Sequence, residues 1–155
     1  MGLEIFISYS SIDLNTIETI IKPLKEQEGV NIFCAEYSLN PGQKISNTII
    51  QKISNSDLFM LFHSANASDS SYVQQEIGIA KANNKTIIPI LLDSTSLDGM
   101  LEDINYINLS DPDKRDQEMS RFYHYISAKK QSKKKTQLLG VLGFLAIGIM
   151  ILSEK

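Results

Sequence analysis

Cysteine is nearly absent from this sequence of 155 residues, in which Cys34 stands alone. A disulfide bond within the chain is therefore impossible, which is typical of proteins from reducing compartments. The two histidines, His63 and His124, stand apart and complete no Cys/His spacing of a metal site, so we expect no bound metal. A glycine-rich phosphate-binding loop is also missing. These absences exclude disulfide scaffolds, zinc modules and P-loop enzymes.

Basic residues are scarce in the first 128 residues, where 9 lysines and arginines face 17 acids, a balance of −8. An acidic domain is repelled by a phosphate backbone, so we expect no nucleic-acid partner. The bases are concentrated instead in residues 129–135, which contain five lysines and no acid. This segment is too short to be a domain and needs its own explanation.

Short apolar runs alternate with segments of helical spacing along residues 1–128. The runs predict strands at 3–8, 30–35, 57–63, 86–92 and 104–109. The helical spacing predicts helices around 17–24, 45–53, 72–83 and 119–126. Pro23 lies inside the first of these helices, so we expect a bend or an early break there.

Strands that are apolar throughout and alternate with helices are typical of a parallel sheet covered on both faces. We therefore predict a doubly wound α/β domain, with a flavodoxin-like sheet of five parallel strands. Sites in such domains form at the carboxyl ends of the strands. That rule brings together residues 8–13, 36–44 and 64–76.

The C-terminal segment has a different composition, because residues 138–152 contain no polar side chain. With residues 136, 137 and 153 it would form a helix of about 27 Å, close to the bilayer core of about 30 Å. We predict a transmembrane helix over 136–153 that anchors the chain, with 129–135 as a basic linker. The positive-inside rule then places the domain of residues 1–128 in the cytoplasm. A buried core helix or an oligomerisation helix is the alternative.

Glu76 is the acid that is most suggestive of chemistry. It lies in residues 64–80, where Asp69 is the only other charged residue. Tyr72 precedes it by four residues, so both side chains share one face of the predicted helix. An aromatic ring and a carboxylate on one face suit a ribose with a stacked ring. A solvated helix glutamate is the alternative.

Four segments together resemble one family. Residues 6–13, Phe-Ile-Ser-Tyr-Ser-Ser-Ile-Asp, resemble the first strand and following loop of TIR domains. Residues 39–42, Leu-Asn-Pro-Gly, look like the BB loop of that family. Residues 72–77 resemble the Trp-x-x-x-Glu signature of its enzymatic branch, with Tyr72 in place of Trp, and residues 87–90 resemble its fourth strand. The resemblance covers about residues 3–127.

The resemblance implies an NAD glycohydrolase or cyclase of bacterial antiphage defence, with NAD as substrate and no cofactor. Glu76 would be the catalytic carboxylate. The substrate-binding residues would be Tyr9, Ser10, Ser11, Gly42, Lys44 and Tyr72.

The leaving nicotinamide is neutral, so the reaction needs no general acid, and one carboxylate can stabilise the developing positive charge. The family builds its site across two protomers, which implies activation by self-association. Confinement of the anchored chain to a membrane would favour such pairing. Two alternatives stay open: a non-enzymatic adaptor that docks partners through residues 36–44, and a nucleotide-sensing module that binds without turnover.

Overall fold

The computed structural model describes residues 2–34 and 47–153, with side chains as far as residue 145. Its centre is a sheet of five parallel strands in the order β2-β1-β3-β4-β5. The strands are β1 (Leu3–Ser8), β2 (Val30–Cys34), β3 (Leu58–His63), β4 (Thr86–Leu91) and β5 (Ile107–Asn108). This is the flavodoxin-like strand order, in which the chain changes direction between β1 and β3. The predicted sheet is confirmed.

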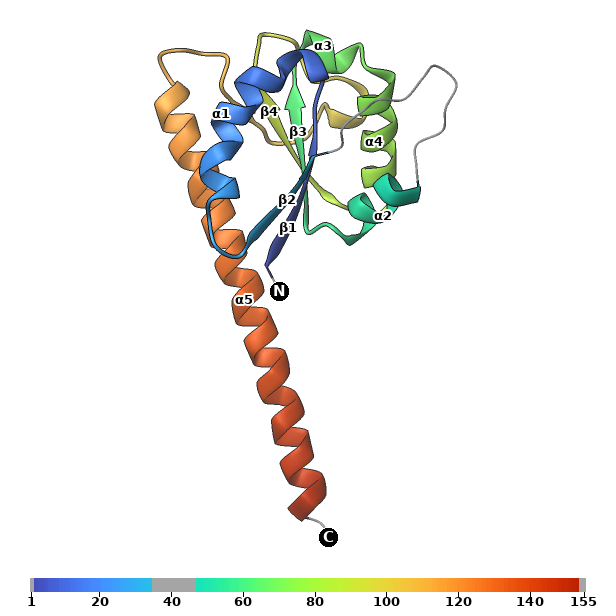
Figure 1. Cartoon of the computed structure of the whole chain (residues 1–155), viewed down its shortest axis with the longest axis vertical. Helices are drawn as coiled ribbons and strands as arrows, with labels where there is room; N and C mark the ends of the chain where they lie inside the picture. The colour runs from blue at the N-terminus through green and yellow to red at the C-terminus, as the bar shows by residue number, and fades with distance from the viewer. Residues whose placement is uncertain (1, 35–46, 154–155) are drawn as a thin grey trace.

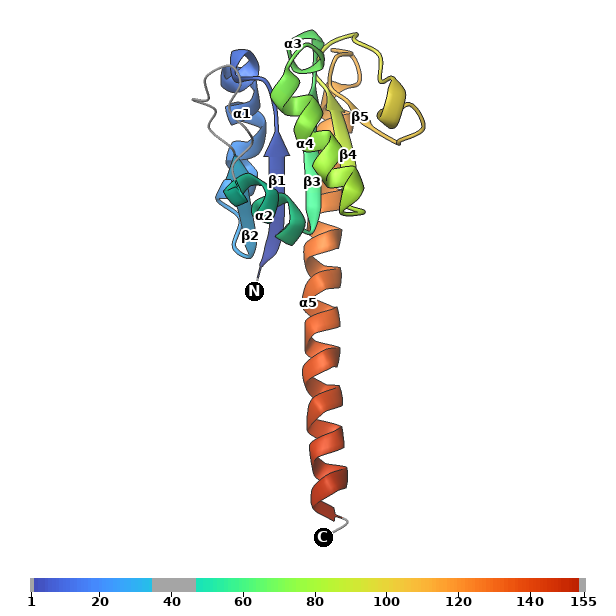
Figure 2. The ribbon, with the colours of Figure 1, turned by 90° about the vertical axis from the view of Figure 1, so that its right-hand side faces the viewer.

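Helices cover both faces of the sheet (Figures 1 and 2). One face carries α1 (Leu14–Lys25) and the first part of α5 (Arg115–Ser153), and the other carries α2 (Asn47–Asn55), α3 (Ala65–Ser68) and α4 (Ser71–Ala82). Two short 3-10 helices, η1 (Ser11–Asp13) and η2 (Gly99–Leu101), lie in the connections. All paired strands run parallel, so their carboxyl ends meet at one edge of the sheet.

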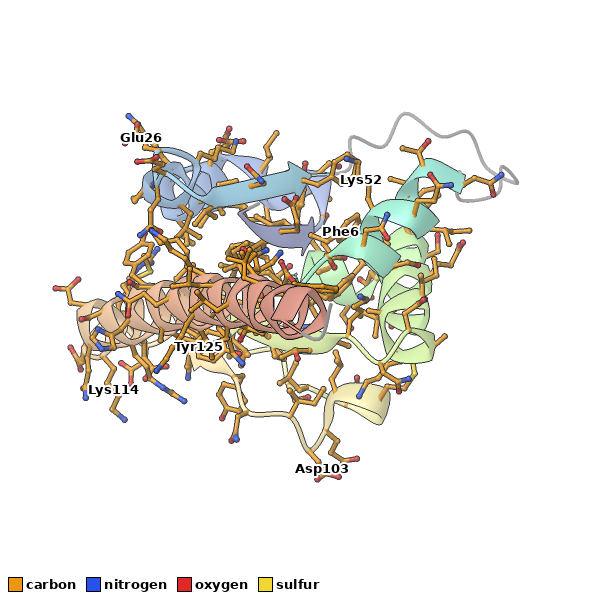
Figure 3. All side chains as sticks on the ribbon, turned by 90° about the horizontal axis from the view of Figure 1, so that it is seen from below. Phe6, Glu26, Lys52, Asp103, Lys114 and Tyr125 are labelled. Atoms are coloured by element: carbon orange, nitrogen blue, oxygen red, sulfur yellow. The ribbon has the colours of Figure 1, made fainter. Side chains whose placement is uncertain are left out.

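The sheet separates two apolar cores. On one face, the buried side of α1 packs with Phe122 and Ile126 of α5. On the other face, Phe6 stacks on Phe59 at a centroid distance of 5.5 Å among apolar residues of α2 and α4. Figure 3 shows Phe6 and Lys52 together on the α2 side and Tyr125 apart from them on α5. The strands are apolar throughout because both of their faces are buried.

Two local predictions need correction. β5 consists of two residues and not the predicted six, because only Ile107 and Asn108 pair with β4. Residues before them turn away, and the N–H of Ile104 donates to the carbonyl of Leu101.

The expected early break at Pro23 is also absent, since α1 runs through it to Lys25. Proline removes one donor, and a position so near the end of the helix makes that loss easy to tolerate.

The lysine-rich segment 129–135, predicted as a basic linker, is helical and belongs to α5. The Lys133 ammonium donates to Oδ2 of Asp57 at 2.6 Å and to the carbonyl of Gly2 at 2.8 Å. Lys130 donates to the carbonyl of Glu28 at 3.1 Å. These two lysines therefore fasten the helix to the amino end of the sheet, beyond which α5 extends away from the domain (Figure 1).

The transmembrane helix predicted over 136–153 is not supported. Among the helices of the described residues, none combines the length and the apolar character that crossing a membrane requires. α5 is long, but it is strongly charged as far as Lys135. The cytoplasmic location of residues 1–128, which followed from the anchor, stays a prediction.

Candidate active site

The candidate site lies where the strand order changes, between the carboxyl ends of β1 and β3. The two strands pair in register there, with Ser8 opposite Leu61. After β3 the chain forms α3 and then α4, whose first turn is capped by Ser70: its hydroxyl accepts the N–H of Val73 at 3.4 Å. This path carries the second turn of α4, with Glu76, back to the end of β1.

Glu76 is completely buried. Its Oε2 accepts a hydrogen bond of 2.5 Å from the Ser8 hydroxyl, and its Oε1 has no partner among the described residues. Burial raises the pKa of Glu76 from 4.5 to about 8, although the hydrogen bond from Ser8 lowers it. The carboxyl is therefore mostly neutral at pH 7. A solvated helix glutamate, the alternative considered for Glu76, is excluded.

The position of Glu76 follows from the apolar face of α4. Val73, Ile77 and Ala80 are buried against the sheet, and Glu76 shares that face with them. A carboxyl buried with one partner is costly to the fold, so such groups are concentrated at functional sites. Its free Oε1 can accept a hydrogen bond from a ligand, and its ionised form can stabilise a cation.

Asp13 joins two of the loops that form this edge of the sheet. Its Oδ2 accepts a hydrogen bond of 2.5 Å from the Ser64 hydroxyl, and its Oδ1 accepts one of 2.8 Å from the Asn66 amide. Ser64 also caps α3 by accepting the N–H of Ala67 at 3.0 Å. The predicted meeting of residues 8–13 with residues 64–76 is thereby confirmed.

The other predicted site residues differ in their placement. Tyr9 and Ser10 are buried, and the Ser10 hydroxyl accepts the N–H of Ile12 at 3.4 Å, which caps η1. Ser11 is exposed in η1, and Tyr72 is half-buried in the turn of α4 before Glu76. Gly42 and Lys44, with the rest of segment 36–44, lie outside the described residues. Their roles in binding stay predictions.

Sequence reasoning missed Ser8 as a partner of Glu76. Its position carried one signal, because Ser8 is the polar residue that ends an apolar strand at the expected site edge. His63, at the end of β3, is buried, and its Nε2 lies 2.9 Å from the carbonyl oxygen of Ser96.

A depression in the surface lies away from this edge. It has a volume of about 450 Å³ and is lined by residues that include Thr86, Tyr106, Arg121 and Tyr125, from β4, α5 and the segment before β5. Neither Ser8 nor Glu76 lines it. Within residues 2–34 and 47–153, no group of histidine, cysteine and acidic side chains is arranged to hold a metal ion.

The geometry defines a doubly wound α/β domain with a buried carboxyl at its topological switch point. A family model described as TIR domain matches residues 5–123. The chain therefore belongs to the TIR domain family, as its motifs indicated.

One solved structure agrees with this assignment at the level of the fold. The TIR domain of the Toll-related receptor TRR-2 from Hydra magnipapillata superposes with a TM-score of 0.66 at 21% identity, over 81% of this chain and 99% of that one. The TIR domains of the activated Roq1 resistosome, which recognises the pathogen effector XopQ, give a TM-score of 0.48 at 18% identity, over 88% of this chain and 78% of that one. Comparison with curated proteins gives no match.

Proposed function

We propose that this TIR domain cleaves NAD at the bond between nicotinamide and ribose, with Glu76 as the catalytic carboxylate. The observation that carries the proposal is the buried carboxyl of Glu76, whose Oε1 has no partner among residues 2–34 and 47–145 and lies at the switch point of the sheet. Ligands of doubly wound domains bind at this point. NAD is the substrate, and the reaction needs no cofactor.

The reaction breaks the C–N bond between the ribose and the pyridinium ring. The bonding electrons go to the ring nitrogen, so nicotinamide leaves as a neutral molecule and positive charge develops on the ribose. The ionised Glu76 stabilises that charge at short range in a site of low dielectric. Attack by water, with loss of a proton to solvent, gives ADP-ribose, whereas attack by a nucleophile of the same molecule gives a cyclic product.

Ionisation of Glu76 is coupled to the charge of its ligand. The raised pKa keeps the carboxyl mostly neutral in the free domain at pH 7. A pyridinium ring close to the carboxyl favours its ionised form and lowers its pKa. The substrate therefore generates the anion that its own cleavage requires, and one proton is released to solvent on binding.

Self-association is the second part of the proposal. The resemblance to TIR enzymes implies a site completed by a neighbouring protomer, with segment 36–44 at the contact. Turnover per protomer should then rise with protein concentration. Signalling in bacterial antiphage defence is the setting that the resemblance implies.

The test is the release of nicotinamide from NAD by the full chain, followed by chromatography over a range of protein concentrations. Glu76→Gln is the test variant, and Glu26→Gln, at the exposed residue after α1, is the matched control. We expect turnover by the parent and the control, with a loss of at least about 100-fold in Glu76→Gln, the scale of one electrostatic catalytic group. Equal turnover by all three proteins would remove Glu76 from the mechanism. No turnover by any of them would favour the adaptor alternative.

A further inference from the structure

The contact between Ser8 and Glu76 is buried on both sides. Neither side chain is exposed to solvent, and the Oγ–Oε2 distance is 2.5 Å. The two residues are 68 positions apart and belong to different elements. When Glu76 is ionised, the Ser8 hydroxyl can donate to it a charge-assisted hydrogen bond, which is stronger than the bond to the neutral acid.

The backbone of Ser8 is held firmly. β1 pairs with β2 on one side and with β3 on the other, and Ser8 is the last residue in register with β3. A hydroxyl on a central strand has little freedom of position, so its bond to Glu76 fixes the carboxyl on α4. Functional groups supported in this way by rigid elements keep their orientation in the absence of substrate.

The electrostatic surroundings of Glu76 contain no other partner within the described part of the chain. Burial, which raises its pKa, and the Ser8 hydrogen bond, which lowers it, are the causes that the described residues supply. On the neighbouring α2, the Lys52 ammonium lies 5.2 Å from the centre of the Phe33 ring. On α4, Lys81 is exposed in the last turn. Asp69, after α3, is also exposed.

We infer that Ser8 is a positioning residue: its hydroxyl holds Oε2 of Glu76 and leaves Oε1 as the oxygen that accepts a hydroxyl of the substrate ribose. This inference rests on the proposed function for the identity of the substrate. The hydroxyl has two effects. It fixes which oxygen faces the ligand, and it favours the ionised carboxyl, because a hydroxyl donates more strongly to an anion than to a neutral acid.

Removing the Ser8 hydroxyl should change how turnover depends on pH, whereas a loss of packing should lower turnover equally at every pH. Without Ser8 as donor, Glu76 should bind its proton about tenfold more tightly, as expected for one hydrogen bond to a charged group. Less of the ionised form is then present at pH 7, and turnover falls. Raising the pH restores the ionised form, so the deficit of the variant shrinks in alkaline solution.

The experiment uses the full chain labelled with ¹³C at the side-chain carboxyl of glutamate, and the signal of Glu76 is assigned by its absence in Glu76→Gln. The titration of this signal is compared in the parent, Ser8→Ala, Ser8→Cys and Ser56→Ala. Ser56 is a matched control, since it is a buried serine at the other end of the sheet whose hydroxyl donates to the carbonyl of Ile53. The pH profile of nicotinamide release is recorded for the same four proteins.

We expect Ser8→Ala to shift both the ¹³C titration of Glu76 and the acid limb of the nicotinamide-release profile to higher pH. The shift should correspond to a proton concentration about tenfold lower. Ser8→Cys, with a weaker donor of similar size, should lie between it and the parent, and Ser56→Ala should match the parent. The inference would be overturned if the Glu76 titration in Ser8→Ala matched that of the parent while turnover fell equally at every pH. If Ser8→Ala fails to fold, an unmoved titration in Ser8→Cys has the same meaning. A moved titration in a chain that never consumes NAD would refute the proposed function and leave the Ser8–Glu76 coupling in place.

Discussion

Replacing Glu76 with glutamine should remove a loss of folding stability that the carboxyl causes as the pH rises. The folded chain binds the Glu76 proton more tightly than the unfolded chain, because burial raises the pKa from 4.5 to about 8. The neutral carboxyl therefore favours the folded state below pH 4.5. As the pH rises, the unfolded chain ionises first and gains stability relative to the folded one, until the folded chain also ionises near pH 8.

The magnitude follows from the two pKa values. At about 1.4 kcal/mol per pKa unit, the loss of folding free energy between pH 4 and pH 9 amounts to about 5 kcal/mol, and about 3 kcal/mol of it has occurred by pH 7. Glutamine has nearly the same shape and does not titrate. The unsatisfied hydrogen bonds of its amide cost the variant the same free energy at every pH. The effect of Glu76 ionisation is therefore read from how the difference in unfolding free energy between variant and parent changes with pH.

Urea unfolding of the parent and Glu76→Gln full chains at several pH values between 4 and 9 provides the assay. We expect the difference in unfolding free energy to grow in favour of Glu76→Gln by about 3 kcal/mol between pH 4 and pH 7, and to level off above pH 8. Glu26→Gln, at an exposed position, should show no such trend. A difference that stays constant over the whole range would refute the account of a buried, perturbed carboxyl.

Three further substitutions, away from the candidate site, test the contacts that hold the fold together. Phe122→Ala, at a fully buried residue that joins α5 to the sheet, should cost about 3–5 kcal/mol in urea unfolding. Asp57→Asn should cost about 1–2 kcal/mol and increase proteolysis within α5, because Asp57 accepts both Lys133 and a backbone N–H. Lys25→Ala should change stability by less than about 1 kcal/mol, since its pair with Glu18 is largely exposed. A cost above about 2 kcal/mol for Lys25→Ala would contradict this ranking.

The strands could be predicted from the sequence because burial on both faces leaves a plain signal. Residues 58–63 are all buried, and the corresponding apolar run is visible in the sequence. The boundaries of β5 could not be predicted, since they depend on which residues meet β4. The continuity of α5 was also hidden, because lysine is a good helix former and a change of composition does not end a helix.

The candidate site was predictable in part. Motif resemblance and the switch-point rule identified Glu76 and the loops after β1 and β3. The hydrogen bond from Ser8 could not be predicted, because it depends on the register of β1 and on the rotation of α4 about its axis. The burial of Glu76 was hidden as well, since its neighbours Gln74 and Gln75 are exposed and the local sequence is polar.

The proposed mechanism requires that the carboxyl of Glu76 lie beside the ribose and the pyridinium ring of bound NAD. The most direct test follows the ¹³C signal of the Glu76 carboxyl in the full chain at saturation with an NAD analogue that keeps the pyridinium charge and resists cleavage. The analogue should lower the pKa of Glu76 from about 8 towards neutrality, because a nearby cation favours the carboxylate. An unchanged titration of Glu76 with the analogue bound would contradict the account.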